Sequence, residues 1–251
     1  MRIVFLSVDD EFAGNMQKYL YETHPEWVVG SVISTCPIFK KKPLEAVGFI
    51  LRRSGLRFFL EMARMKLLRK FTDREEKISP LNLAEKYGVP VRHSFNINDK
   101  KSLIELAAFE PDIVISTNFS HYIGKRAREI AKYGTWNLHK AYLPRYRGMA
   151  PSFFALLEGA EEVGCTLHRV TKGFDTGDII CQVAVPVAPD DTVYTLNKKT
   201  SAAGGRMMAD FLVREDISTV QAVPQPEGDW TNYTYPTPRE VREFLKMGLR
   251  F

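Results

Sequence analysis

The chain has 251 residues, of which 45% are hydrophobic and 26% are charged, as in an ordinary soluble globular protein. No apolar stretch reaches the roughly 18–20 residues that cross a bilayer, and the N-terminus turns acidic at Asp9-Asp10-Glu11, so we expect no signal peptide. Three cysteines without C-x-x-C spacing indicate reduced thiols rather than a zinc site, so we expect a cytoplasmic protein and no metal.

Apolar runs bounded by turn residues predict strands at 2–8, 28–35, 89–92, 112–116, 134–139, 166–170 and 179–187. Helical patterns fill most of the intervals, at 11–23, 79–87, 99–109, 124–133, 151–158, 191–213 and 237–247. Ser79-Pro80, Asp99 and the capping box at Thr237-Pro238-Arg239-Glu240 mark three helix starts. Strands that alternate with helices predict an α/β fold with a doubly wound, mostly parallel sheet, whose ligands bind at the carboxyl ends of the strands.

The formal net charge is +5, and basic residues gather in one segment. Residues 39–77 hold twelve Lys/Arg against five acids. Within this segment, residues 47–71 alternate apolar pairs with basic residues at helical spacing, with a break at Ser54-Gly55. Such a helix can pack on its own domain or on a twin subunit, bind RNA phosphates, or lie on an anionic membrane. We rank packing first and the membrane surface last.

One strand end carries an amide and an imidazole two residues apart, Asn137 and His139. Residues i and i+2 of a strand share a face, so both side chains point the same way. Asp175 follows in a turn, G-F-D-T-G-D. If the three groups meet, the amide and imidazolium can hold a developing oxyanion while the carboxylate sets the charge of the imidazole. The pattern predicts an acyl-transfer site.

Four motif blocks occur in order, and together they resemble a known family. The blocks are N-L-H at 137–139, L-P-R-Y-R-G-M-A-P at 143–151, G-C-T-L-H-R-V at 164–170 and G-F-D-T-G-D-I-I at 173–180. They resemble the signature of formyltransferases that use 10-formyltetrahydrofolate, and are nearest to the methionyl-tRNA and nucleotide-sugar branches. The match is dense over 134–187 and weaker but colinear over 2–134. The resemblance implies a Rossmann-like formyltransferase fold with a short C-terminal appendage.

The resemblance also implies site residues. Asn137, His139 and Asp175 are the expected catalytic residues, and Asp175 is expected to raise the pKa of His139. His168 is expected to support them without touching the substrate. The expected cofactor-binding residues are Asn118, Phe119, Ser120, Tyr122, Thr171, Lys172, Gly173 and Phe174. The expected acceptor-binding residues are Asp9, Asp10, Arg145, Tyr146 and Arg147.

Two departures from the family pattern bear on the acceptor. A glycine-rich turn after the first strand would cradle phosphate, but Asp9 and Asp10 stand there and favour an amine. Met149 follows the loop glycine where nucleotide-sugar members can carry a basic contact. Both changes leave the identity of the acceptor open.

The function that we predict is formyl transfer from 10-formyltetrahydrofolate to a primary amine of a small molecule, such as an amino sugar linked to a nucleotide. Three alternatives stay open: methionyl-tRNA formylation, hydrolysis of the formyl donor, and a folate-binding or membrane-surface protein without catalysis. A homodimer is also left open. We expect a catalytic domain over residues 1–215, with a basic helical insertion at about 39–78, and a C-terminal extension over 216–251 that ends in a helix.

Overall fold

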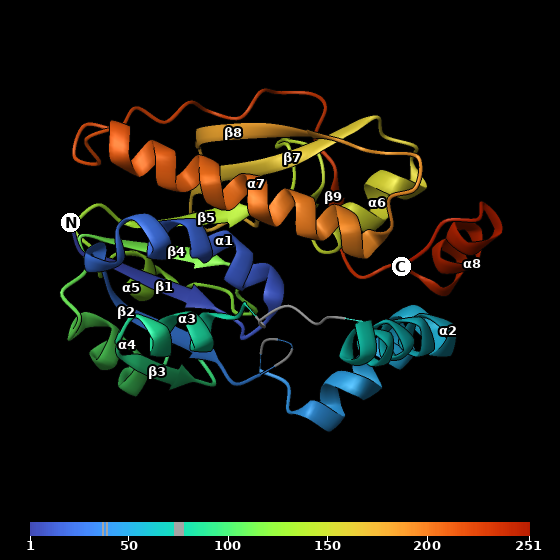
Figure 1. Ribbon diagram of the computed structural model, residues 1–251, viewed down its shortest axis with the longest axis horizontal. Helices are drawn as coiled ribbons and strands as arrows, with labels where there is room; N and C mark the ends of the chain where they lie inside the picture. The colour runs from blue at the N-terminus through green and yellow to red at the C-terminus, as the bar shows by residue number, and fades with distance from the viewer. Residues whose placement is uncertain (37, 39, 73–77) are drawn as a thin grey trace.

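The computed structural model describes residues 1–36, 38, 40–72 and 78–251, so Arg74 and Lys77 of the predicted basic segment lie outside the described residues. A seven-stranded sheet forms its centre, in the order β3-β2-β1-β4-β5-β7-β8 (Figure 1). Its parallel strands are β1 (Ile3–Ser7), β2 (Val28–Ser34), β3 (Val91–Ser94), β4 (Ile113–Thr117) and β5 (Thr135–His139). Strands β7 (Glu162–Arg169) and β8 (Ile179–Pro186) continue it in antiparallel pairing. The predicted mostly parallel α/β fold is confirmed.

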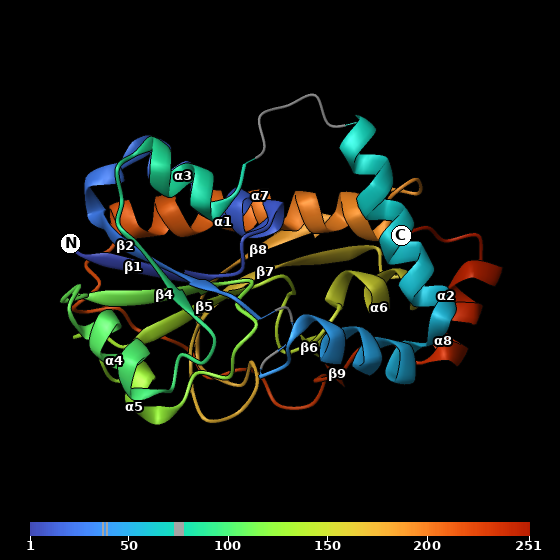
Figure 2. The same cartoon turned by 90° about the horizontal axis from the view of Figure 1, so that it is seen from below.

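Helices cover both faces of this sheet, as Figure 2 shows. One face carries α1 (Glu11–Thr23), α3 (Pro80–Lys86) and α7 (Val193–Arg214), and the other carries α4 (Lys100–Ala107) and α5 (Lys125–Arg128). Side chains of β1 alternate between the two cores: Ile3 and Phe5 pack toward α1 and α7, whereas Val4 and Leu6 pack toward α4. All five residues of β1 are buried, because a parallel strand covered on both faces meets no solvent.

Several predicted boundaries differ from the structure. Strand β7 begins at Glu162 rather than residue 166, and two other differences have identifiable reasons. Helix α5 ends at Arg128 rather than near residue 133, because the N–H groups of Lys132 and Tyr133 donate to the carbonyl oxygens of Pro111 and Asp112 instead. Strand β3 begins at Val91 rather than residue 89, because the Val89 N–H closes the end of α3 on the Ala84 carbonyl. The predicted helix caps at Ser79, Asp99 and Thr237 are confirmed; they begin α3, α4 and the C-terminal helix α8 (Pro238–Lys246).

The basic segment forms α2 (Pro43–Thr72), which bends at Gly55, where φ is 84°. The predicted break is therefore confirmed, and glycine suits it because other residues disfavour positive φ. One face of α2 packs on the C-terminal helix α8 (Pro238–Lys246), and the two helices lie side by side in Figures 1 and 2. Phe58 of α2 is buried with its ring 5.5 Å from that of Phe251. This face of α2 therefore packs on its own chain, as the sequence analysis predicted first for the basic segment.

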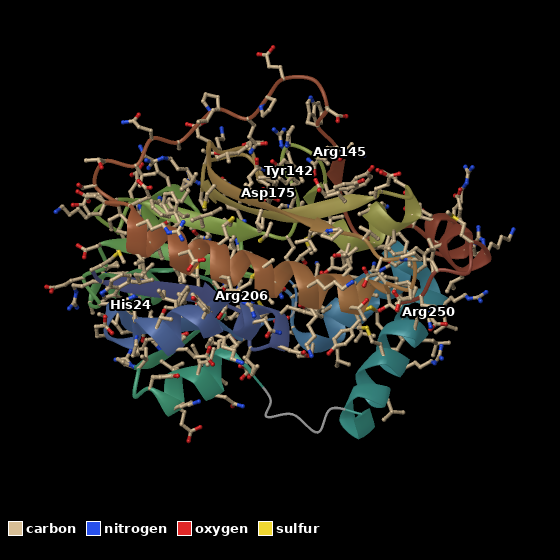
Figure 3. All side chains as sticks on the ribbon, turned by 45° about the horizontal axis from the view of Figure 1, so that its top comes forward. His24, Tyr142, Arg145, Asp175, Arg206 and Arg250 are labelled. Atoms are coloured by element: carbon tan, nitrogen blue, oxygen red, sulfur yellow. The ribbon has the colours of Figure 1, made fainter. Side chains whose placement is uncertain are left out.

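The tail returns across the end of the sheet before it reaches α8. Its strand β9 (Asn232–Tyr233) pairs with β6 (Arg147–Gly148), just before helix α6 (Pro151–Leu157). A short 3-10 turn, η1 (Pro25–Trp27), completes the elements. Near the chain end, Arg250 donates to the Asp190 carbonyl oxygen at 3.2 Å, at the end of the molecule where α2 and α8 lie (Figure 3). Across the described ranges, none of the helices is long and apolar enough to cross a membrane.

Candidate active site

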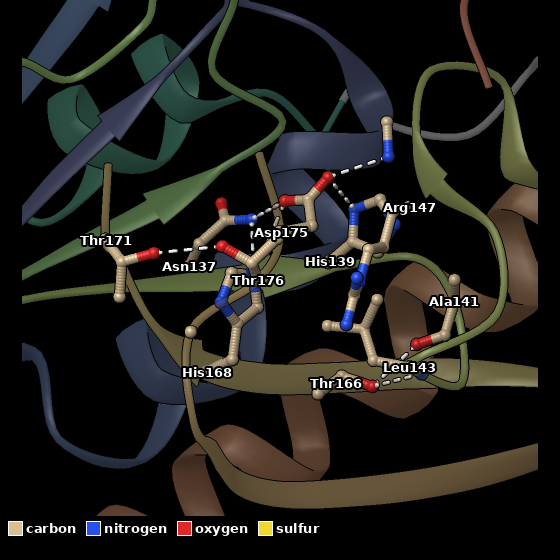
Figure 4. A network of polar contacts seen from close by, with 12 residues as sticks. Asn137, His139, Ala141, Leu143, Arg147, Thr166, His168, Thr171, Asp175 and Thr176 are labelled. Atoms are coloured by element: carbon tan, nitrogen blue, oxygen red, sulfur yellow. Dashed lines mark hydrogen bonds and ion pairs between the residues drawn. The ribbon is translucent and has the colours of Figure 1, made fainter. Parts of the chain in front are cut away.

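Asn137 and His139 lie near the carboxyl end of β5, between parallel β4 and antiparallel β7. The register places Asn137 directly opposite His168 of β7, so their side chains share a face. Asp175 reaches the same point from the turn after β7, where its φ is 51°. The three predicted catalytic residues are thus brought together, with His168 as a fourth member (Figure 4).

Asp175 is the centre of this network. One oxygen, Oδ2, accepts the Gly148 backbone N–H at 2.9 Å and lies 3.6 Å from His139 Nδ1. The other, Oδ1, accepts from Asn137 Nδ2 at 3.3 Å and lies 3.5 Å from His168 Nε2. Burial alone would raise the pKa of Asp175, but the neighbouring imidazoles and the Gly148 N–H outweigh it, so the pKa falls well below its usual range. The carboxylate is therefore ionised at neutral pH.

The contacts of Asn137 and His168 fix where their protons lie. Because the carboxylate of Asp175 only accepts, the amide nitrogen of Asn137 must face it. That nitrogen also lies 3.1 Å from His168 Nε2, which must then be the acceptor. His168 Nδ1 lies 2.9 Å from the Arg169 carbonyl oxygen and must carry the hydrogen. Both constraints place a hydrogen of His168 on Nδ1, and both amide hydrogens of Asn137 are engaged.

His139 is held by a main-chain group. Its Nε2 donates to the Tyr146 carbonyl oxygen at 2.9 Å, so Nδ1 is the nitrogen that gains or loses a proton, facing Asp175. Burial lowers the pKa of His139, and the Asp175 charge, which acts upward as predicted, does not reverse this. The predicted effect of Asp175 on this pKa therefore has the expected direction, but burial outweighs it, since the imidazole is only 8% exposed. In this state of the site His139 is neutral.

The turn that carries Asp175 is clamped from the tail by Gln225. Its Nε2 donates to the carbonyl oxygens of Asp175 and Gly177, at 2.7 and 2.8 Å. Its Oε1 accepts from Arg147 Nε and Nη2, at 3.0 and 2.6 Å. Arg147, predicted to bind the acceptor, therefore supports the Asp175 turn through Gln225, a residue that the sequence analysis did not single out. Nothing in the pattern around Gln225 pointed to the site, since it lies 50 residues from Asp175.

The other predicted acceptor residues also have partners within the chain. Tyr146 is buried and donates through its hydroxyl to Glu158 at 2.9 Å, while Arg145 lies 3.7 Å from the same carboxylate. Asp10 caps α1 by accepting the Ala13 N–H, and Asp9 accepts the Leu81 N–H. That these four residues bind the acceptor stays a prediction. To do so, each would first have to give up one of these contacts within the chain.

Beside His139, Lys140 extends the polar network toward the end of β1. Its Nζ lies 3.3 Å from Asn118 Oδ1 and 4.8 Å from the centre of the Phe12 ring. The amide nitrogen of Asn118 in turn donates to Asp10 Oδ2 at 2.7 Å. Burial lowers the pKa of Lys140 and raises that of Asp10. Three strand ends, those of β1, β4 and β5, are thereby joined at the switch point of the sheet.

The two segments predicted to bind the cofactor lie against each other. The Tyr122 hydroxyl donates to the Lys172 carbonyl oxygen at 3.2 Å, and the Tyr122 ring lies 5.7 Å from that of Phe174. Phe174 is 64% exposed, an unusual state for a large apolar ring. The Phe119 ring lies 4.4 Å from that of His121, and the Ser120 hydroxyl donates to the Cys36 carbonyl oxygen at 2.9 Å.

The remaining predicted residues complete this neighbourhood. The Thr171 and Thr176 hydroxyls lie 3.1 Å apart, and a Cβ on Gly173 would come within 2.2 Å of the Thr176 hydroxyl oxygen. Among the residues that the structure describes, no group of three or more His, Cys, Asp or Glu side chains is placed to hold a metal ion.

Comparison with known proteins gives one consistent family. The family model described as "Formyl transferase" matches residues 65–212. A methionyl-tRNA formyltransferase from Halalkalibacterium halodurans is 36% identical over 144 residues, which are 57% of this chain and 45% of that protein. One from a Geobacillus species is 34% identical over 157 residues, covering 62% and 49% of the two chains. The chain spans about half the length of these curated relatives.

Solved structures agree in fold. An N-formyltransferase from Helicobacter canadensis, in complex with folinic acid and dTDP-3-aminofucose, has a TM-score of 0.61 at 20% identity, over 96% of this chain and 72% of its own. A glycinamide ribonucleotide transformylase from Symbiobacterium toebii also has a TM-score of 0.61 at 20% identity, over 90% and 94%. A formyltransferase from Anoxybacillus kamchatkensis, in complex with a UDP-linked formamido sugar and tetrahydrofolate, is 25% identical with a TM-score of 0.51, over 72% and 85%. The chain belongs to the formyl transferase family.

Proposed function

We propose that the protein transfers a formyl group from 10-formyltetrahydrofolate to a primary amine of a small molecule. The observation that carries the proposal is the meeting of Asn137, His139 and Asp175 around one point at the carboxyl end of β5. An amide, a neutral imidazole and an ionised carboxylate are the groups that acyl transfer to an amine requires. The family match over residues 65–212 supports the same chemistry.

The formyl donor fits the predicted cofactor segments. Tyr122 and Phe174 offer aromatic surface beside main-chain donors and acceptors, which suits a flat heterocycle with polar edges. The exposure of Phe174 is explained if a folate ring covers it. When bound, 10-formyltetrahydrofolate supplies the activated formyl carbon.

The residues can divide the work of the transfer as follows. When the acceptor nitrogen adds to the formyl carbon, that nitrogen loses a proton and the formyl oxygen gains negative charge. His139 Nδ1 holds an open lone pair in the neutral state, so it can take this proton. The resulting imidazolium would lie 3.6 Å from the Asp175 carboxylate, which would stabilise it. When the bond between the formyl carbon and the donor nitrogen breaks, the imidazolium can return the proton to that leaving nitrogen, which gives tetrahydrofolate and neutral His139. Asn137 can supply an N–H to the oxyanion by giving up its contact with His168.

For the acceptor we favour an amino sugar linked to a nucleotide. Two structures of similar fold hold such compounds, dTDP-3-aminofucose in one and a UDP-linked formamido sugar in the other. The carboxylates of Asp9 and Asp10 suit an ammonium group better than a phosphate. We further propose that residues 1–215 form the catalytic domain, which the extension at 216–251 completes through Gln225, and that the protein works in the cytosol.

A methionyl-tRNA acceptor is the second candidate, because the curated relatives that match carry that name. In that case the basic residues of α2 would contact phosphates in place of the segments of those relatives that this chain does not cover. Affinity would then fall steeply with salt, since each phosphate contact releases a counterion. A small-molecule acceptor predicts a shallow salt dependence.

The test is to incubate the purified protein with 10-formyltetrahydrofolate and one of four additions: nucleotide-linked amino sugars, methionyl-tRNA, glycinamide ribonucleotide or no amine. Release of tetrahydrofolate is followed optically, and products are weighed by mass spectrometry. One formyl mass gained by an amino sugar supports the proposal, and the same gain on methionyl-tRNA supports the second candidate. Release without any amine identifies a hydrolase, and no release in any sample, while folate still binds, contradicts catalysis.

A further inference from the structure

The second half of α2, beyond the bend at Gly55, has two apolar faces rather than one. Its inner face packs through Phe58 against Phe251 and the α8 region. Its outer face carries Leu56, Leu60 and Leu67, which we call the leucine stripe, with exposed fractions of 62%, 55% and 58%. Their spacing of four and seven residues places all three on one side of the helix. The stripe is a second apolar face that the rest of the described chain leaves uncovered.

Arginines border the leucine stripe. Arg57 comes directly after Leu56, and Arg64 comes directly after Ala63. Both arginines are exposed, and they line the same flank of the leucine stripe. The whole helix carries seven Lys/Arg and only two acids, Glu45 and Glu61. Glu61 pairs with Arg64 at 3.3 Å. The surface therefore combines exposed leucines with a net positive border.

These two properties together select the partner. A second copy of the chain would bring the arginine borders of both copies to one interface, with few acids to offset them. An RNA would satisfy the arginines but would not cover three leucines. An anionic bilayer satisfies both, because leucines enter the boundary of the acyl chains while arginine stems reach up to the lipid phosphates.

We propose that the outer face of α2, centred on the leucine stripe and bordered by Arg57 and Arg64, binds the protein to the surface of an anionic lipid bilayer. The inner face of α2 stays packed on α8, so binding requires no rearrangement of the fold. The helix lies in the headgroup region and does not cross the membrane, in keeping with its charge. The proposal concerns where the enzyme works and does not depend on which amine it formylates.

The test is co-sedimentation of the full chain with vesicles of phosphatidylcholine alone or of phosphatidylcholine and phosphatidylglycerol in equal parts. We expect binding only to the second kind. Leu60→Ser with Leu67→Ser should weaken binding by more than about tenfold, since each leucine buries a full apolar side chain. Arg57→Gln with Arg64→Gln should weaken it by roughly fivefold per arginine. Turnover of a nucleotide-linked amino sugar in solution should be unchanged in the leucine variant.

The matched control is Val213→Ser, which removes an exposed apolar side chain (53% exposed) from the far end of α7, away from α2 in Figure 1. It should bind vesicles like the parent. Circular dichroism verifies that each variant is folded. Absence of binding to the anionic vesicles, or equal binding by the leucine variant, overturns the proposal. A dimer in sedimentation equilibrium that separates in the leucine variant assigns the stripe to a second copy and also overturns it.

Discussion

The clamp formed by Gln225 gives the sharpest prediction about how this site is held. Gln225 makes two hydrogen bonds to the carbonyl oxygens of Asp175 and Gly177, and each such bond stabilises by about 1 kcal/mol. The turn needs this support because Asp175 has a positive φ of 51°, a conformation that costs about 1 kcal/mol or more. Gln225→Ala should therefore remove about 2 kcal/mol of stabilisation from the turn that positions Asp175. This corresponds to a loss of roughly 30-fold in kcat.

The assay is steady-state formyl transfer, with thermal unfolding measured in parallel. Gln225→Glu serves as the matched variant: it keeps a partner for Arg147 but turns a carboxylate toward the two carbonyl oxygens. We expect it to lose activity like Gln225→Ala while retaining more thermal stability. Because Asp175 acts on His139, the pH profile of kcat should also shift in both variants. If Gln225→Ala keeps kcat within threefold of the parent with the same pH profile, the clamp has no part in positioning Asp175.

Three further predictions concern single residues. Asn137→Ala and His139→Ala should each lose about 10²–10³ in rate without unfolding; near-normal turnover in either would remove that residue from the mechanism. Burial lowers the pKa of His121 to about 4. The contribution of this residue to stability is therefore present above its ordinary pKa of about 6.5 and is lost as pH falls toward 4. Urea unfolding at neutral and acid pH should show this loss of stability, and the loss should be smaller in His121→Gln. Gly148→Ala would place a Cβ 2.2 Å from the Tyr233 carbonyl oxygen, so it should lower the free energy of unfolding by several kcal/mol. Gly159→Ala has a similar positive φ but open space around it, so it should lower this free energy by about 1 kcal/mol. Equal melting temperatures for the two variants would contradict the steric reason.

Local sequence signals were sufficient for most of the fold. Helix starts at Ser79, Asp99 and Thr237 could be predicted because a capping side chain acts on a backbone N–H within three residues. The bend at Gly55 could be predicted for the same reason, since only the local φ is involved. The end of α5 could not, because it depends on carbonyl oxygens of Pro111 and Asp112 that arrive from a preceding loop.

For the site residues, too, local patterns could be predicted and contacts from distant segments could not. Asn137, His139 and Asp175 were predictable as a set, because strand alternation and the motif blocks place them together. The groups that orient them were not, since the Tyr146 carbonyl and the Gly148 N–H are main-chain atoms that every residue possesses. The charge state of His139 was also beyond the sequence. Proximity to Asp175 raises the pKa of His139 and burial lowers it, and only the three-dimensional packing decides which effect is larger.

The contacts between the tail and the sheet have a consequence for how the protein is made. Gln225 holds the turn of Asp175, and Thr231 accepts the Tyr146 N–H at 2.7 Å, so residues late in the chain shape a site whose side chains are translated much earlier. During synthesis the sheet can form from β1 to β8 while these late residues are still inside the ribosome. The nascent chain should therefore form the sheet before it acquires activity, because Gln225 and Thr231 emerge only after β8.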